Sequence, residues 1–178
     1  MTSYMVELRP FGESDLWLIE QACLDPEFSA PFEWVWFRSL EAYKQRWTED
    51  QMLSKSPYGL CVSLLKDNSA VGWVSWRETE RAGPFVWEIG ALVIPEMRGR
   101  GIGTRAQSLL VDYLFAHTPT HRIWAGTEVE NVAEQRALEH CGLSQEGLLR
   151  GNHFRDGQWR DSYIYAIRRP ENDDRPRP

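Results

Sequence analysis

Glu88-Ile-Gly-Ala-Leu-Val-Ile-Pro95 and the glycine-rich run that follows it, Arg98-Gly-Arg-Gly-Ile-Gly-Thr104, are the stretch that decides the fold of this chain. Residues Phe85–Ile94 are apolar almost throughout apart from Glu88, which predicts a buried strand. The sequence after the loop predicts a helix, because apolar residues recur there at helical spacing, at Ile102, Ala106, Leu109, Leu110, Tyr113 and Leu114.

The loop from Arg98 to Thr104 has the composition of a phosphate-binding loop. Its three glycines let the backbone turn and approach a ligand closely, because they carry no Cβ atom. The helix that follows offers backbone N–H groups without intrahelical partners and the positive end of its dipole. Arg98 and Arg100 add charged donors. These features together predict a site for a pyrophosphate.

Two common phosphate motifs do not fit this loop. A Walker loop places Lys and Ser or Thr after its last glycine, but here Thr104-Arg105 follows Gly103. The dinucleotide fingerprint needs a third glycine where this chain has Thr104. An Arg-x-x-Gly-x-Gly loop remains, with a glycine-rich turn that binds no ligand as the alternative.

Elements on both sides of this unit predict a mixed α/β sheet. Strands are expected at Tyr4–Leu8, Tyr58–Leu65, Ala70–Trp76, Arg122–Gly126, Leu148–Phe154 and Trp159–Ile167. Helices are expected at about Glu13–Cys23 and Ser39–Leu53, and after Asn131 up to Gly142 as the residue beyond the helix end. Asp156-Gly157 predicts a type I′ hairpin turn between the last two strands.

Length and composition indicate one domain over residues 1–169 and a disordered tail over 170–178. The 178 residues contain 42% hydrophobic and 26% charged residues, which is typical of globular proteins. A net charge of −6 argues against nucleic acid as the main partner. The absence of a signal peptide or a long apolar run argues against a membrane partner, and three cysteines without metal or redox spacing fit a cytoplasmic location.

The chain resembles the GNAT superfamily of N-acetyltransferases, and most closely its RimJ/RimL-type branch. The resemblance runs from about Trp87 to Ile167. It rests on the strand and loop quoted above, on Asn131-Val-Ala-Glu-Gln-Arg-Ala-Leu-Glu-His-Cys-Gly-Leu143, and on the hairpin Gly147-Leu-Leu-Arg-Gly-Asn-His-Phe-Arg-Asp-Gly-Gln-Trp-Arg-Asp161. It implies a mixed, mostly antiparallel seven-stranded sheet flanked by helices. The strands Phe85–Ile94 and Arg122–Gly126 would splay apart within it.

The same resemblance implies direct transfer of an acetyl group from acetyl-CoA to a primary amine, either a protein N-terminus or a small molecule, without a metal. Pantetheine would lie between the splayed strands, and an N–H near Leu92 or Val93 would polarise the thioester carbonyl. The residues expected to bind the cofactor are Ala91, Leu92, Val93, Arg98, Gly99, Arg100, Gly101, Ile102, Gly103, Thr104 and Asn131. A homodimer is left open. The alternatives are a non-catalytic acyl-CoA-binding protein on the same fold and an interaction module whose loop binds another phosphate.

Glu88 is the expected catalytic base, because it is the only acid in its strand and stands where several family members carry a catalytic glutamate. It could instead pair with an arginine on the sheet face. The chain departs from the family in having Leu138 in place of a tyrosine acid and Glu134 in place of a serine. Asn131 and Glu134 also resemble a capping box. Glu128 and Glu130, expected in a loop, are weaker candidates for the base.

The aromatic residues from Phe28 to Phe37 are expected either to pack in the core or to line a wall beside the acceptor. The acceptor itself would lie against Pro26–Trp36 and the final hairpin. His121 and His153 are expected to be structural, and Cys141 is expected to pack near a helix end.

Overall fold

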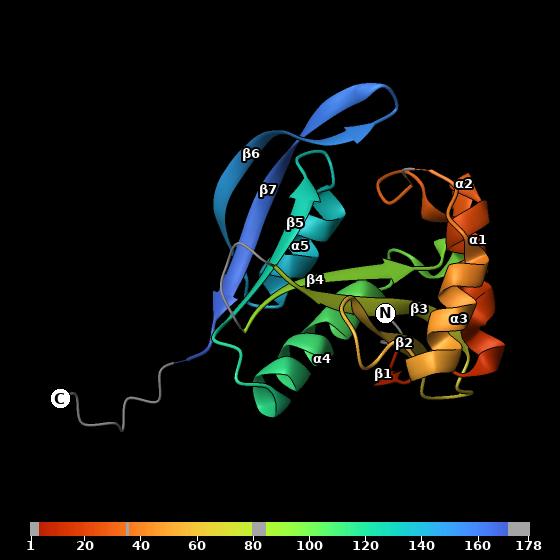
Figure 1. Ribbon diagram of the computed structural model, residues 1–178. Helices are drawn as coiled ribbons and strands as arrows, with labels where there is room; N and C mark the ends of the chain where they lie inside the picture. The colour runs from red at the N-terminus through yellow and green to blue at the C-terminus, as the bar shows by residue number, and fades with distance from the viewer. Residues whose placement is uncertain (1–3, 35, 80–84, 171–178) are drawn as a thin grey trace, which may run out of the picture.

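The computed structural model describes residues 4–34, 36–79 and 85–170. A seven-stranded sheet in the order β1-β2-β3-β4-β5-β7-β6 forms its centre (Figure 1). The strands are β1 (Val6–Arg9), β2 (Tyr58–Leu64), β3 (Ala70–Glu78), β4 (Val86–Val93), β5 (Arg122–Glu128), β6 (Ser144–Arg155) and β7 (Gln158–Arg168). The pair β4 and β5 is parallel and the other neighbouring pairs are antiparallel, which confirms the expected mixed, mostly antiparallel sheet.

Helices cover both faces of the sheet. They are α1 (Leu16–Leu24), α2 (Pro26–Ser29), α3 (Leu40–Asp50), α4 (Ile102–His117) and α5 (Val132–His140), with short 3₁₀ turns η1 (Glu13–Asp15) and η2 (Pro95–Met97). One apolar cluster joins α4 and α5 to one face, and a second joins α1, α2 and α3 to the other. Figure 1 shows α1, α2 and α3 grouped together, apart from α4 and α5.

The alternation of side chains along β4 decides which residues face the site. Ile89 belongs to the cluster under α4, whereas Leu92 belongs to the cluster under α1. Because successive strand residues point to opposite faces, Glu88 shares the face of Leu92. Glu88 therefore lies on the face that carries α1, α2 and α3.

The two central strands separate soon after they meet. β4 pairs with β5 only at Val86, Trp87 and Glu88. From Ile89 onward, β3 is the only described strand that pairs with β4. The predicted splaying of these strands is therefore confirmed. Backbone groups along the second half of β4 are left facing a gap rather than a neighbouring strand.

Local sequence signals account for most element ends. Ser39 caps α3 through its hydroxyl, which accepts from Ala42 N at 3.3 Å. Gly142 follows α5 with a φ of 86°. Asp156 and Gly157 both have positive φ, as the predicted type I′ turn requires.

The connection after α1 differs from the sequence prediction, and the predicted tail is not tested. The connection predicted from Pro26 contains the short helix α2, which begins with Pro26 after an Asp25 cap. The tail predicted from residue 170 lies outside the described residues from position 171 onward. No helix in the described part of the chain is long and apolar enough to cross a membrane.

Candidate active site

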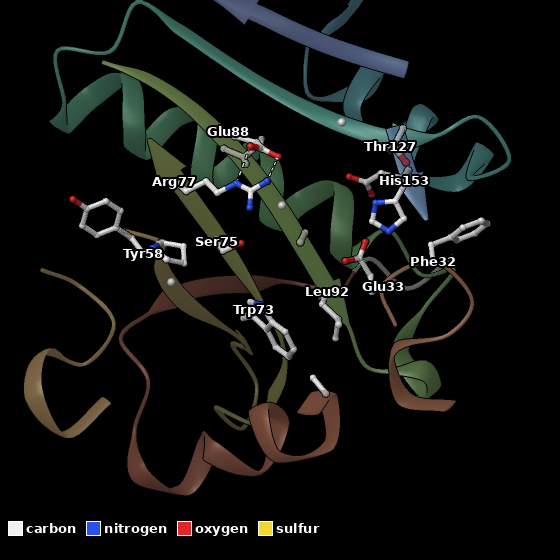
Figure 2. A pocket seen from close by; sticks show the side chains of 18 of the residues that line it. Phe32, Glu33, Tyr58, Trp73, Ser75, Arg77, Glu88, Leu92, Thr127 and His153 are labelled. Atoms are coloured by element: carbon white, nitrogen blue, oxygen red, sulfur yellow. Dashed lines mark hydrogen bonds and ion pairs between the residues drawn. The ribbon is translucent and has the colours of Figure 1, made fainter. Parts of the chain in front are cut away.

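A cleft of about 670 Å³ opens on the face of the sheet that carries α1, α2 and α3. Its floor consists of β3 and β4, and its far wall consists of β5, the start of α5 and the β6–β7 hairpin (Figure 2). The turn that follows α2 contributes Phe32 and Glu33. The cleft therefore brings together the predicted cofactor strand, the predicted acceptor segment and the hairpin.

An ion pair crosses the floor of the cleft. Arg77 on β3 stands opposite Glu88 on β4 in the strand register. Its Nε donates to Glu88 Oε2 at 2.8 Å and its Nη2 donates to Oε1 at 2.7 Å. The Glu88 side chain is 17% exposed, and this contact raises the pKa of Arg77. Both oxygens of the predicted base are thus engaged by one guanidinium, as in the alternative role considered for Glu88.

Two other carboxylates line the cleft without such a partner. Glu134 lies in the first turn of α5, and Glu33 lies in the turn that follows α2. Among the described residues, no Lys, Arg or His nitrogen lies within 4.0 Å of either carboxylate. The cleft therefore presents two carboxylates available to a cation.

Burial changes the proton affinity of both carboxylates. Desolvation raises the pKa of Glu134 to about 7, with repulsion from Glu33 in the same direction. The amide Nε2 of Gln107 donates to Glu134 Oε2 at 3.3 Å and opposes this increase. Desolvation also raises the pKa of Glu33, and the nearby His153 opposes that shift. Glu33 nevertheless has an exposed side chain, because it faces the open cleft and is crowded only by the cleft walls.

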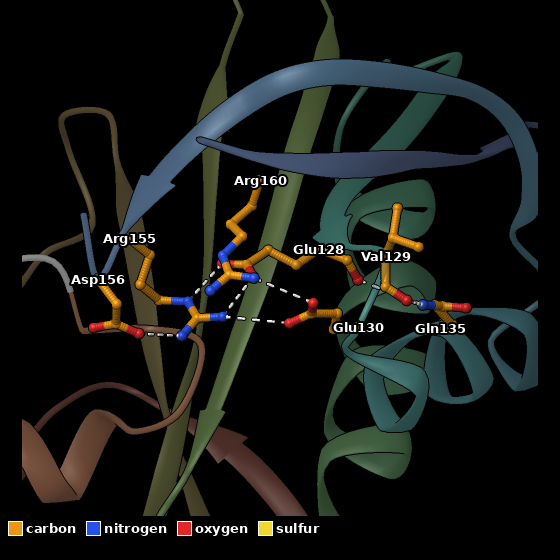
Figure 3. A network of polar contacts seen from close by, with 7 residues as sticks. All are labelled: Glu128, Val129, Glu130, Gln135, Arg155, Asp156 and Arg160. Carbon is orange, nitrogen blue, oxygen red and sulfur yellow. Dashed lines mark hydrogen bonds and ion pairs between the residues drawn. The ribbon is translucent and has the colours of Figure 1, made fainter. Parts of the chain in front are cut away.

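A third carboxylate, that of Glu128, forms an ion pair with Arg155 through both of its oxygens (Figure 3). Arg155 of β6 donates from Nε to Glu128 Oε1 at 2.9 Å and from Nη2 to Oε2 at 2.8 Å. The two side chains are 9% and 6% exposed, and Arg155 lowers the pKa of Glu128. The expectation of a loop position for Glu128 is wrong, because this residue ends β5 and is buried against the hairpin. Glu130 is 61% exposed and accepts from Arg160 at 3.2 Å.

The glycine loop has the backbone geometry of an anion site. Gly99 and Gly101 have φ of 69° and 77°, and an added Cβ would meet no atom within 4 Å at either position. The open space lies where a ligand would approach. Gly101 precedes α4, and no side chain caps the first turn of this helix. Backbone amides in the first turn of a helix form the kind of site that binds phosphate groups.

The two arginines of the loop have neighbours within the chain. Arg98 donates to Val93 O at 2.9 Å, and also to Ala30 O and Phe28 O. Desolvation lowers its pKa. The Arg98 side chain therefore ties the loop to the turn after α2, which the sequence does not reveal. Arg100 lies over the ring of Tyr4 and donates to its hydroxyl at 2.7 Å.

Asn131 acts as the cap of α5. Its Oδ1 accepts from Glu134 N at 3.3 Å, as the capping-box pattern predicts. The reciprocal half of that pattern is wrong, because Asn131 N donates to Glu128 O and the Glu134 carboxylate is bonded to Gln107 instead. Leu138, at the position where the family resemblance leads one to expect a tyrosine acid, is fully buried.

The aromatic residues between Phe28 and Phe37 are expected either to pack in the core or to line the acceptor site, and different residues do each. Phe28 is buried in the core, and Phe32 lines the cleft with its ring 5.3 Å from the guanidinium carbon of Arg155. Trp36 is 65% exposed and Phe37 is 69% exposed, so neither packs in the core. His153 also lines the cleft, and its buried Nε2 has no hydrogen-bond partner among the described residues.

The sequence alone does not indicate that Glu33 lines the cleft, that Gln107 contacts Glu134 or that Arg77 pairs with Glu88. Arg77 reaches Glu88 only through the register of two antiparallel strands. Gln107 and Glu134 are brought together by the contact between α4 and α5. A signal existed for Glu134 alone, because an acid stands three residues after the capping asparagine.

Comparisons with known proteins agree with this geometry. The family model described as "Acetyltransferase (GNAT) domain" matches residues 6–144. A probable N-acetyltransferase, YjcK of Bacillus subtilis, is 30% identical over 139 residues, which are 77% of each chain. A putative ribosomal N-acetyltransferase, YdaF of the same organism, is 27% identical over 64% of this chain and 61% of its own length.

A solved structure shares the fold. The spermidine N-acetyltransferase of Vibrio cholerae, crystallised with CoA and spermine, superposes with a TM-score of 0.76. The match covers 92% of this chain and 95% of the other, at 20% sequence identity. At this identity the likeness supports the fold, and the choice of acceptor has to be argued from the residues of this chain.

Proposed function

This chain belongs to the GNAT acetyltransferase family and is an N-acetyltransferase that uses acetyl-CoA, and we propose that it transfers the acetyl group directly to the primary amine of a cationic small molecule. The observation that carries this proposal is one cleft in which the β4–β5 gap opens beside two carboxylates that have no cationic partner among the described residues. A cationic amine gains Coulomb energy there and meets groups able to take its proton.

The cofactor side of the proposal rests on main-chain donors. Acetyl-CoA supplies the thioester that is cleaved. The backbone of Ala91, Leu92 and Val93 borders the gap. The amides from Gly99 to Thr104 lie in the loop before α4 and in its first turn, and include those of Arg100, Ile102 and Gly103. A backbone N–H fixed near Leu92 or Val93 would stabilise negative charge on the carbonyl oxygen by about 3 kcal/mol.

Direct transfer is supported by the state of the thiols. Burial raises the pKa of Cys23 and Cys141, and that of Cys61 to about 12. A thiol with a raised pKa forms little thiolate at neutral pH and is a poor nucleophile. We therefore propose that the amine attacks the thioester without an acyl-enzyme.

The proton balance requires a base on the protein or in water. An ammonium ion has no lone pair, so it must lose a proton before it attacks. Both oxygens of Glu88, the base predicted from the sequence, accept hydrogen bonds from Arg77, so this carboxylate already has a cationic partner before an amine binds. We assign to the Arg77–Glu88 pair the task of shaping the floor of the cleft beside the acceptor.

The branch of the family, the class of acceptor and the cellular location are further parts of the proposal. Similarity to a putative ribosomal N-acetyltransferase supports the RimJ/RimL-type branch and with it a protein N-terminus as acceptor. The uncompensated carboxylates favour a small cationic amine instead. We also propose a cytoplasmic location, since all three cysteines are free. A homodimer remains a prediction from the sequence.

An acceptor screen tests the function. Purified protein is incubated with acetyl-CoA and a matched series of amines, and the release of free thiol is measured. The series contains a monoamine, a diamine, a triamine, free amino acids and short peptides with free N-termini. We expect turnover to rise with the positive charge of small amines. Coenzyme A binding by calorimetry without turnover on any amine would instead support the non-catalytic alternative.

A further inference from the structure

We propose that Glu134 is the group that accepts the proton of the acceptor amine, supported from behind by Gln107 and faced across the cleft by Glu33. This inference rests on the proposed function and names one further catalytic residue for it. It differs from the expectation drawn from the sequence, in which Glu88 is the base.

The position of Glu134 suits this role. The residue lies in the first turn of α5, the helix that follows β5 in the chain, and its side chain lines the cleft. β5 is the strand that separates from β4, so α5 begins at the wall opposite the exposed half of β4. An amine that reaches the gap between the strands therefore passes between Glu134 and the turn that carries Glu33.

Gln107 provides a support that suits a group which changes its protonation state. Its side chain is completely buried in α4, and its Nε2 donates to Glu134 Oε2 at 3.3 Å. Its Oε1 is buried and has no hydrogen-bond partner among the described residues. An amide can donate to a carboxylate through its NH₂ group and can accept from a protonated carboxyl through its oxygen. Gln107 can thus satisfy both forms of Glu134.

The charges around Glu134 favour a base active near neutral pH. Glu33 is the charged group that acts on it from across the cleft, and the Cys141 thiol lies just beyond the end of α5. Repulsion from Glu33 and desolvation bring the pKa of Glu134 to about 7. A base with a pKa near the working pH combines a populated anionic form with useful proton affinity.

Glu33 is in turn held by charges from three other parts of the chain. Desolvation raises the pKa of Glu33 and Glu128 adds to this rise, whereas His153 in the hairpin, Arg38 before α3 and Arg98 in the glycine loop oppose it. None of the three cations lies within 4.0 Å of its carboxylate. Glu33 can therefore attract the ammonium while Glu134 takes its proton.

The proton and electron balance is simple. The Glu134 carboxylate takes one N–H proton from the ammonium and leaves a neutral amine with a lone pair. That lone pair forms the new N–C bond, and the carbon–sulfur bond breaks with its electrons on sulfur. The sulfur leaves as a thiolate, and the second proton lost from nitrogen converts it to the thiol. Glu134 then releases its proton to water and returns to the carboxylate.

A pH study with two opposing variants tests this role. The base must be deprotonated, so kcat should rise with pH through the pKa of Glu134. Glu33→Gln removes a like charge and should move this rise to lower pH, by about 0.5–1 unit. Gln107→Leu removes the donor to the carboxylate and should move it to higher pH by a similar amount. Glu139→Gln, the same change on an exposed face of α5, should leave the profile in place.

Direct titration provides a readout that does not depend on turnover. Glutamate labelled with ¹³C at the side-chain carboxyl gives NMR signals, and the signal lost in Glu134→Gln identifies Glu134. We expect this signal to titrate near pH 7 in the protein without substrates and to shift in the two variants as above. Titration near the ordinary glutamate range, or a pH–rate profile that neither variant moves, would overturn the assignment. If Glu134 titrates near pH 7 but the wild type shows no turnover on any amine, the proposed function alone would be refuted.

Discussion

The Arg77–Glu88 pair and the Glu33–Glu134 pair lie in the same cleft and show opposite states of a carboxylate. Glu88 accepts two hydrogen bonds from one guanidinium, so its negative charge is neutralised where it stands. Glu134 has a single neutral donor and a second carboxylate across the cleft, so its charge is opposed rather than compensated. A position on the predicted catalytic strand is therefore compatible with a carboxylate that is held in an ion pair. Its immediate partners decide how readily it takes a proton.

Glu128 is a third carboxylate to compare, and its replacement should have the largest effect on stability. Its contact with Arg155 is buried on both sides, so Glu128→Ala would leave the guanidinium with only its more exposed partners, Asp156 and Glu130. We expect the free energy of unfolding to fall by about 3 kcal/mol, as measured by urea denaturation. Glu130→Ala, on an exposed partner of the same network, should cost less than about 1 kcal/mol. Equal stability of the two variants would show that the buried pair does not hold the hairpin to β5.

Glu134→Gln should make the protein more stable at high pH. A carboxyl whose pKa is about 7 when folded, above its ordinary 4.5, binds more protons in the folded state between these pH values. Wild-type stability therefore falls as pH rises through this window. The variant lacks this loss and should gain about 1–3 kcal/mol at pH 8, with no gain at pH 4. A constant difference across pH would mean that Glu134 titrates normally.

The glycine loop separates the cofactor side from the carboxylates. Gly101→Val combined with Gly103→Val forces a side chain onto a positive φ and adds bulk at the start of α4. We expect the calorimetric affinity for coenzyme A to fall at least tenfold, or about 1.4 kcal/mol. Gly147→Val on β6, which has open space around it, should leave the affinity unchanged. Unchanged affinity in a folded double variant would exclude this loop as the phosphate site.

The aromatic segment gives the smallest expected effect. Phe32 lines the cleft, so Phe32→Ala should raise the KM for the acceptor a few-fold and leave the KM for acetyl-CoA nearly unchanged. Trp36 is 65% exposed and lies outside the cleft lining, so Trp36→Ala is the matched control. A larger effect from Trp36 than from Phe32 would move the acceptor site to the outer surface of this segment.

The sequence could predict the parts of the site that are continuous in the chain. The strand before Pro95, the loop from Arg98 to Thr104 and the hairpin turn at Asp156 carry local signals, and each forms as expected. Glycine and turn residues act through the backbone at their own position, so their effect is visible without a fold.

The carboxylate pairs could not be predicted in this way. Arg77 meets Glu88 through strand register, and Glu134 meets Gln107 where α5 packs on α4. Glu33 comes from the least regular part of the chain, between α2 and α3. Such contacts depend on tertiary packing, which residue type and spacing do not determine. The best sequence signal for Glu88, its isolation in an apolar strand, is common to a base and to one half of an ion pair.

The most direct test of this account is the pH dependence of kcat for Glu88→Gln and Glu134→Gln, measured side by side with the best acceptor. We expect Glu134→Gln to lower kcat by about 10²–10⁴ and to remove the rise with pH, because the proton acceptor is gone. We expect Glu88→Gln to keep that rise and to remain within about tenfold of the wild type. The reverse result, with the rise lost in Glu88→Gln and retained in Glu134→Gln, would contradict the account and restore Glu88 as the base.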